Sequence, residues 1–316
     1  MVHSISIYSW PKKLLKEIEN WSRNFIWSGD ISKRKLETVS WKKTSTPLSE
    51  EGFGIRSLTL LNEFANVKLC WDLLNSQEDW AILIRSKVLR GRRVISRHVY
   101  SSIWSSIKSE FDTIISNSGW QVGTCNKNNS WLDKWCGDPI AYQLNIPSHL
   151  HSNLNATVSD FIVNGQWSIP FSVLLSFPEV KYLAEQITIP VEESEDKLLW
   201  MKSNNGNLCF KEAFLFKYGT GQNINWAKTL WRPDIPPSKS LHVWRLMHNK
   251  IPTYDNLMSK GVQLPSISSS CSCNWESSLH MFFECPYAMK LWNWLFSIIN
   301  FSMQFNTTSD FWLLFE

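Results

Sequence analysis

The sequence feature that most constrains the fold is a cluster of thiols and one imidazole. It reads Cys271-Ser-Cys273-Asn-Trp-Glu-Ser-Ser-Leu-His280-Met-Phe-Phe-Glu-Cys285 and gathers three of the seven cysteines and one of the seven histidines. Thiolate and imidazole are the ligands that zinc prefers, and four of them in one short segment can close a tetrahedral site. The cluster therefore predicts a structural zinc. Its expected ligands are Cys271, Cys273, His280 and Cys285.

Local signals around the cluster predict how these ligands converge. Ser277 or Ser278 can cap a short helix that carries His280. Pro286 disfavours helical geometry at Cys285 and begins the next helix, so Cys285 is expected at a corner between two helices. A single residue separates the first two cysteines, whereas zinc turns more often use two to four. Two interpretations stay open: a closed Cys3His structural site, and a vestigial cluster that binds metal poorly or not at all.

Cysteine usage and hydropathy predict an intracellular protein, in the nucleus or cytoplasm. The cysteine count is odd, and the first residues show no basic segment followed by a long apolar stretch. Because no run of about 18 apolar residues occurs either, we expect neither secretion nor a membrane partner. The cysteines outside the cluster are scattered and are expected to be ordinary buried thiols: Cys70, Cys125, Cys136 and Cys209.

Positive charge is concentrated in the first hundred residues. They carry 17 Lys/Arg against 10 Asp/Glu, whereas the remainder carries 15 against 18. The candidate nucleic-acid-binding residues are six cations within thirteen residues, Arg85, Lys87, Arg90, Arg92, Arg93 and Arg97, and a smaller group, Lys33, Arg34 and Lys35. Such patches suit phosphate contacts. A solvated face is the alternative interpretation. The 19 tryptophans are expected mainly to anchor cores, with base stacking as the minority interpretation.

Hydrophobic periodicity predicts a predominantly α-helical α+β chain. Helices are expected over 11–27, 58–74, 80–89 and 102–115, from 211 onward, and after the Pro236-Pro237 pair. A further helix is expected after Thr253, its N-cap, and before Gly261, its stop. The middle of the chain is expected to be irregular, with short strands near 121–122 and 130–132. Two apolar runs, 197–201 and 208–210, flank an Asn/Gly turn and predict a β-hairpin.

The segment that ends in the cluster resembles a known family. Its matching positions, in order and spacing, are Lys239, Trp244-Arg245, Pro252-Thr253, Asn256-Leu257, Gly261, Glu276-Ser277, His280, Phe283, Cys285 and Trp292. This pattern closely resembles the reverse-transcriptase zinc-binding domain, which occurs in LINE-type (non-LTR) retrotransposon polyproteins of plants. Upstream segments are similar to the region that follows the polymerase palm in these elements. They begin at Trp10, Arg23, Gly52 and Trp120.

Two positions depart from the family pattern. That pattern usually begins Cys-x-x-Cys, which would put a cysteine at Ser270, and the middle motif usually carries Gly-Asp-Gly where this chain has Gly123-Thr-Cys125. The resemblance implies four regions. They are a post-palm, thumb- or connection-like helical region (1–116), an irregular middle (117–208), the zinc-binding domain (209–296) and a C-terminal tail (297–316). Met1 is expected to lie inside a longer ancestral reading frame.

The resemblance implies a nucleic-acid-binding accessory region of an RNA-directed DNA polymerase. We find no palm Tyr-x-Asp-Asp motif and no ribonuclease H carboxylates in this sequence, so no catalytic residue is predicted. The expected cofactor is structural zinc, and the expected partners are RNA or DNA and the polymerase domain of the same element. Two alternatives remain: a protein-interaction or structural module that packs on that polymerase domain, and a non-functional remnant of an element.

Overall fold

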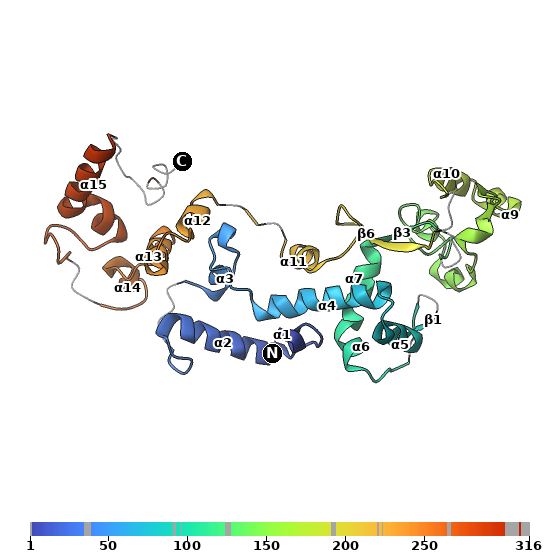
Figure 1. Cartoon of the computed structure of the whole chain (residues 1–316), viewed down its shortest axis with the longest axis horizontal. Coiled ribbons are helices and arrows are strands. Elements are labelled where there is room, and N and C mark those ends of the chain that lie inside the picture. The colour runs from blue at the N-terminus through green and yellow to red at the C-terminus, as the bar shows by residue number, and fades with distance from the viewer. Residues whose placement is uncertain are drawn as a thin grey trace. The chain divides into compact units, whose positions relative to one another are not determined.

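A computed structural model describes residues 2–34, 39–90, 93–95, 97–123, 128–190, 194–219, 221–222, 224–263, 267–300 and 310. They form two compact units, each discontinuous in sequence. The first unit joins 1–11 to 59–219, and the second joins 12–58 to 220–316. Helices dominate and the strands form only small antiparallel ladders, which confirms the predicted α+β class (Figure 1). The division into four sequence regions stays a prediction.

The main hydrophobic core of the first unit lies between several helices and one strand. Its helices are α1 (Val2–Ile5), α4 (Leu58–Asn75), α5 (Asp79–Val88), α6 (Ser102–Ile107), α7 (Phe111–Ser116), α8 (Ile140–Gln143), α9 (Phe171–Ser176), α10 (Glu179–Glu185) and α11 (Phe210–Tyr218). Trp71, Trp104 and Trp200 are buried in the cluster that α4 to α7 form with α11. The tryptophans of this unit therefore anchor a core, as predicted.

The ladders of the first unit differ in part from the prediction. They pair β1 (Leu89–Arg90) with β2 (Arg93–Val94), β3 (Ser118–Gln121) with β6 (Lys197–Trp200), and β4 (Ile162–Val163) with β5 (Gln166–Trp167). The hairpin expected between 197–201 and 208–210 is wrong, because β6 pairs with the distant β3 and not with the residues after its turn. The middle does contain a hairpin, at Asn164-Gly165 between β4 and β5.

A second cluster of buried residues lies in the middle of this unit, around Trp131, Trp135 and Phe161. The strand expected at 130–132 is absent, because these residues form a turn. The backbone N–H of Ser130 donates to the Ala156 carbonyl at 2.9 Å, and the side chain of Trp131 is buried. The apolar residues there fill a core without belonging to a ladder.

The second unit holds the long N-terminal helix and the C-terminal helices. Its elements are α2 (Lys12–Ser28), α3 (Trp41–Thr44), α12 (Asn225–Leu230), α13 (Pro237–Met247), α14 (Tyr254–Met258), the π-helical turn η5 (His280–Glu284) and α15 (Pro286–Ile299). Trp27, Val39, Leu230 and Trp244 form its main core. The helices α2, α13 and α14 confirm the predicted positions, and α14 has Thr253 as its N-cap.

Cysteines outside the cluster only partly match the expectation of buried thiols. Cys70 is buried and Cys136 half-buried, whereas Cys209 is exposed, so that prediction is wrong for Cys209. Burial raises the pKa of the Cys136 thiol to about 12 and that of Cys70 further still. Cys125 lies outside the described residues. Within the described ranges, no helix combines the length and the apolar character needed to cross a bilayer.

Candidate functional site

A short loop presents the first thiol of the cluster. An antiparallel bridge between Ile267 and Trp275 closes the loop, and the Ser268 N–H donates to the Asn274 carbonyl at 2.9 Å. Ser272 has a φ of 57°, a left-handed conformation that lets the chain turn back sharply. The turn places Cys271 at the tip of the loop.

A capped helical turn presents the imidazole. The Ser277 hydroxyl accepts the backbone N–H of His280 at 3.0 Å, which confirms one of the two predicted caps. His280 then begins the π-helical turn η5, in which the Cys285 N–H donates to the His280 carbonyl at 2.7 Å. In an α-helix, residues five apart project about 140° from each other. The wider π turn brings His280 and Cys285 toward the same side.

The last thiol sits at the corner between η5 and α15. Cys285 has extended backbone angles and serves as the N-cap of α15, and Pro286 is the first residue of that helix. This is the helix–helix corner that the Cys-Pro sequence predicts. The side chain of Cys285 is buried, so it can reach only the interior of the corner.

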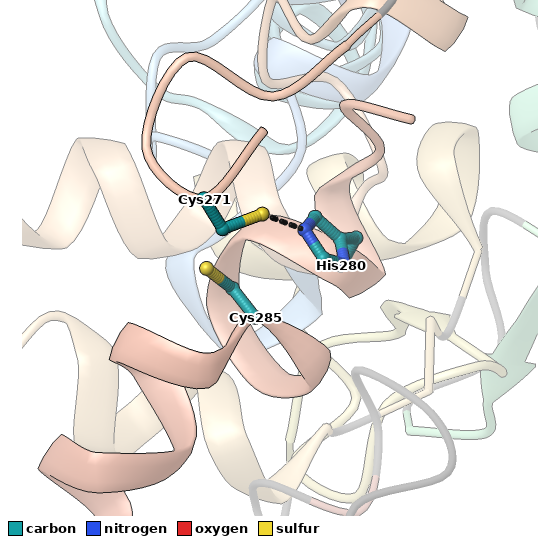
Figure 2. A group of neighbouring side chains, drawn as sticks. All are labelled: Cys271, His280 and Cys285. Carbon is teal, nitrogen blue, oxygen red and sulfur yellow. Dashed lines mark hydrogen bonds between the residues drawn. The ribbon is translucent and has the colours of Figure 1, made fainter. Parts of the chain in front are cut away.

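Cys271, His280 and Cys285 converge on one point (Figure 2). Their ligand atoms all lie within 4.8 Å of one another, and Cys271 Sγ is 3.2 Å from His280 Nε2. Two ligands on one tetrahedral zinc would be about 3.5 to 3.8 Å apart, given Zn–S near 2.3 Å and Zn–N near 2.0 Å. Two thiols and an imidazole at this separation fit a zinc ion, and the three residues are positioned to bind one.

The electrostatics around Cys271 favour the thiolate that zinc needs. The backbone N–H of Cys273 and the imidazole of His280, in that order, lower the pKa of the Cys271 thiol to about 6. Smaller contributions come from Ser268 and from the backbone N–H of Asn274. The thiolate rather than the thiol is the metal ligand. By lowering the pKa of Cys271, the loop favours the form of this side chain that binds metal. The backbone N–H groups are placed there by the conformation of the loop. Their effect on the pKa of Cys271 could therefore not be predicted from the types of residue in the sequence.

Cys273, the fourth predicted ligand, does not join the group. Its side chain is exposed, and its thiol donates to the Cys271 carbonyl at 3.0 Å. Only Ser272, with its left-handed backbone, separates the two cysteines. Its role as a ligand stays a prediction.

A small cluster of apolar side chains packs against the corner between η5 and α15. Phe283 of η5 is buried together with Leu246 and Ile251. Trp292 of α15 stacks on Phe283 with ring centroids 6.2 Å apart, and its Nε1 donates to the Phe282 carbonyl at 2.8 Å. Phe283 and Trp292 are both positions of the family resemblance. Their contact explains the spacing between them: nearly two turns of α15 bring the tryptophan back over η5.

The main basic cluster forms part of a hairpin. The backbone register of β1 and β2 pairs Arg90 with Arg93, and the Ile95 N–H donates to the Val88 carbonyl at 2.9 Å. Val88 is buried and Leu89 packs on the main core of the first unit, whereas Lys87, Arg90 and Arg97 are exposed. Arg92 and the side chain of Arg93 lie outside the described residues.

Arg85 differs from the exposed cations around it. Its Nη1 donates to the carbonyls of Leu73 and Leu74, each at 3.0 Å, at the C-terminal end of α4. Burial lowers the pKa of this guanidinium. Arg85 therefore satisfies carbonyls that a helix end leaves without intrahelical partners.

The smaller basic group lies after α2. Lys33 pairs with Asp30 at 3.4 Å, and Arg34 is exposed. Lys35 lies outside the described residues. This group belongs to the second unit, and the hairpin belongs to the first.

Comparison with known proteins confirms the resemblance. Residues 209–292 match the family described as zinc-binding in reverse transcriptase. A protein of Arabidopsis thaliana, provisionally named a ribonuclease H protein, is 22% identical over 307 residues. The alignment covers 92% of this chain and 49% of that protein, so the chain spans about half the length of its curated relative. No solved structure matches. Cys271, His280 and Cys285 all lie within the segment that matches this zinc-binding family.

Proposed function

We propose that this chain is a nucleic-acid-binding accessory region derived from the reverse transcriptase of a LINE-type, non-LTR element. In this proposal a zinc-closed corner holds the C-terminal helices, and the basic hairpin contacts phosphate. RNA or DNA would be held near the polymerase site of the same element. The family match at 209–292 and the plant relative support the origin.

The observation that carries the proposal is the exposed side chain of Arg90 on the hairpin that β1 and β2 form. Lys87 and Arg97 add exposed positive charge on either side of the hairpin in the sequence. A polyanionic backbone is the ligand that this charge distribution suits.

The zinc group suits a structural role in this proposal. His280 and Cys285 are 2% and 3% exposed, so a metal held there has little access to a substrate. Its effect would be to join the loop at Cys271 to the corner between η5 and α15. A structural metal contributes directly to the folding free energy of the segment it closes.

The test measures binding of a fluorescent RNA oligonucleotide and a DNA oligonucleotide by anisotropy at several salt concentrations. The variant is Lys87→Ala/Arg90→Ala, and the control is Lys202→Ala/Lys211→Ala, which removes two exposed cations elsewhere in the same unit. Each lost phosphate contact lowers the slope of log affinity against log salt by about 0.7 to 0.9. We expect weaker, less salt-dependent binding only in the hairpin variant. Binding that ignores both salt and these substitutions would refute the proposal.

One observation favours a second candidate, a module that packs on the polymerase domain. Four large apolar side chains of α15 are exposed at helical spacing: Tyr287, Leu291, Trp294 and Ile298. The opposite side of the helix packs on η5 through Trp292. Leu291→Glu/Trp294→Glu should then convert a self-associating chain into a monomer in sedimentation experiments. A wild-type chain that is monomeric at all concentrations and binds RNA would count against this candidate.

A further inference from the structure

Among the residues that the structure describes, Tyr100 is the most exposed of the large apolar side chains, at 95% of its full area. It lies between β2 and α6, three residues after Arg97. Neighbouring residues on both sides are anchored. Val99 packs against the main core of the first unit, and the Ser101 hydroxyl caps α6 by accepting the Trp104 N–H at 3.2 Å. Tyr100 is thus held outward by a fixed backbone.

The Tyr100 ring contacts His98, and this contact leaves much of the ring accessible. His98 meets Tyr100 edge to face, with ring centroids 4.6 Å apart and planes at 67°. A T-shaped pair engages the face of one ring and the edge of the other. Most of the Tyr100 surface remains accessible to a planar ligand.

Exposed cations lie close to Tyr100 in the sequence. Arg97 is exposed, and Arg90 is exposed on the hairpin that immediately precedes this segment. Tyr100 follows Val94 of β2 by six positions, so its Cα lies within about 22 Å of that strand. An accessible aromatic face beside cations is the combination that binds single strands, because every base offers a face to stack on and every nucleotide carries a phosphate.

We infer that Tyr100 stacks on a base of single-stranded nucleic acid whose phosphates contact Arg90 and Arg97. This inference rests on the proposed function and adds the class of ligand to it. A base inside a duplex is already stacked on both faces, so the tyrosine can engage only an unpaired base. The hairpin cations, in contrast, would contact the phosphates of a single strand and of a duplex alike.

The test distinguishes the contribution of bases to binding from that of phosphates. Anisotropy titrations of the full chain use three probes of equal length: oligo-uridine RNA, oligo-thymidine DNA, and an abasic DNA that keeps the phosphates. The variants are Tyr100→Ala and Tyr100→Phe, which keeps the ring. The control is Tyr182→Ala, which removes a tyrosine that is 70% exposed on α10.

We expect Tyr100→Ala to weaken binding of the base-bearing strands about fivefold or more, while binding of the abasic strand changes less than twofold. Tyr100→Phe and Tyr182→Ala should bind like the wild type. The larger loss, on RNA or on DNA, identifies the preferred strand. Equal effects of Tyr100→Ala on base-bearing and abasic strands, or no effect on either, would overturn the inference and leave the phosphate contacts standing. A wild-type chain that binds none of the probes would overturn the proposed function as well.

Discussion

Phe53 packs against Trp244, with ring centroids 4.4 Å apart. Trp231 lies on another side of Phe53 at 5.4 Å, and Trp244 Nε1 donates to the carbonyl of Glu51. Next to Phe53, Gly52 lets the chain pass close to Thr46, because a Cβ there would lie 1.9 Å from the Thr46 carbonyl oxygen. The segment before α4 is therefore part of the same packed unit as α13, although the family match begins only at residue 209.

Replacing Phe53 by alanine should destabilise this second unit. Loss of a packed aromatic ring costs about 2 to 4 kcal/mol, since a cavity replaces its contacts with two tryptophans. Urea unfolding followed by tryptophan fluorescence measures the change in free energy of unfolding. Phe171→Ala, which removes a ring that is mostly exposed on α9, is the control and should change it little. Equal stabilities of the two variants would contradict the packing described.

Arg85 should contribute to stability and Lys87 to binding. The Arg85→Ala variant leaves the carbonyls of Leu73 and Leu74 without their donor, at a cost of about 1 to 3 kcal/mol. Lys87→Ala removes an exposed charge and should leave the free energy of unfolding unchanged. Urea unfolding and RNA titration of both variants measure the two effects. If Arg85→Ala were as stable as the wild type, its capping contacts would have no energetic role.

His248 should make the second unit less stable in mild acid. Burial and, next, the Lys43 ammonium lower the pKa of this histidine, Lys250 lowers it slightly, and Glu51 partly opposes them. Since the folded-state pKa lies below the unfolded value of about 6.5, the unfolded chain binds more protons and stability falls as pH drops through 6.5 toward the folded pKa. His248→Gln should flatten this part of the stability–pH curve relative to wild type. His242→Gln, at an exposed position of α13, should not. Parallel curves for all three proteins would refute the assignment.

Local signals predicted the corner of the candidate site well. Ser277, Cys285 and Pro286 act on the backbone within a few residues, and the structure has the cap and the helix start where they indicate. The π turn was not predicted, because five-residue spacing of His280 and Cys285 is compatible with several backbone paths. Convergence of Cys271 depends on a bridge between Ile267 and Trp275, which no local pattern signals.

The pairing of strands that are distant in the sequence could not be predicted from the sequence alone. Residues 197–210 look like a hairpin because two apolar runs flank a turn, yet β6 pairs with β3, and Trp200 is buried against Trp71. The hairpin that does form in the middle of the chain has Asn164-Gly165 at its turn. That dipeptide is the strongest short-range hairpin signal, and it could have predicted β4 and β5.

The thiol of Cys273 should matter less for metal binding than that of Cys271. Only Cys271 faces His280 and Cys285, whereas Cys273 bonds to a backbone carbonyl. Chelator competition should show at least a roughly tenfold smaller loss of zinc affinity for Cys273→Ser than for Cys271→Ser, because the loss of a supporting residue costs less than that of a ligand. Equal losses would indicate that Cys273 turns inward and acts as the fourth ligand.

Metal content of the purified chain tests the central claim most directly. Elemental analysis would compare the wild type with Cys285→Ala and with Cys209→Ala, a control that removes an exposed thiol outside the group. We predict about one zinc per chain in the wild type and in Cys209→Ala, and little in Cys285→Ala. A wild-type chain without zinc, or a Cys285→Ala chain that keeps it, would contradict the assignment of Cys271, His280 and Cys285 as a metal centre.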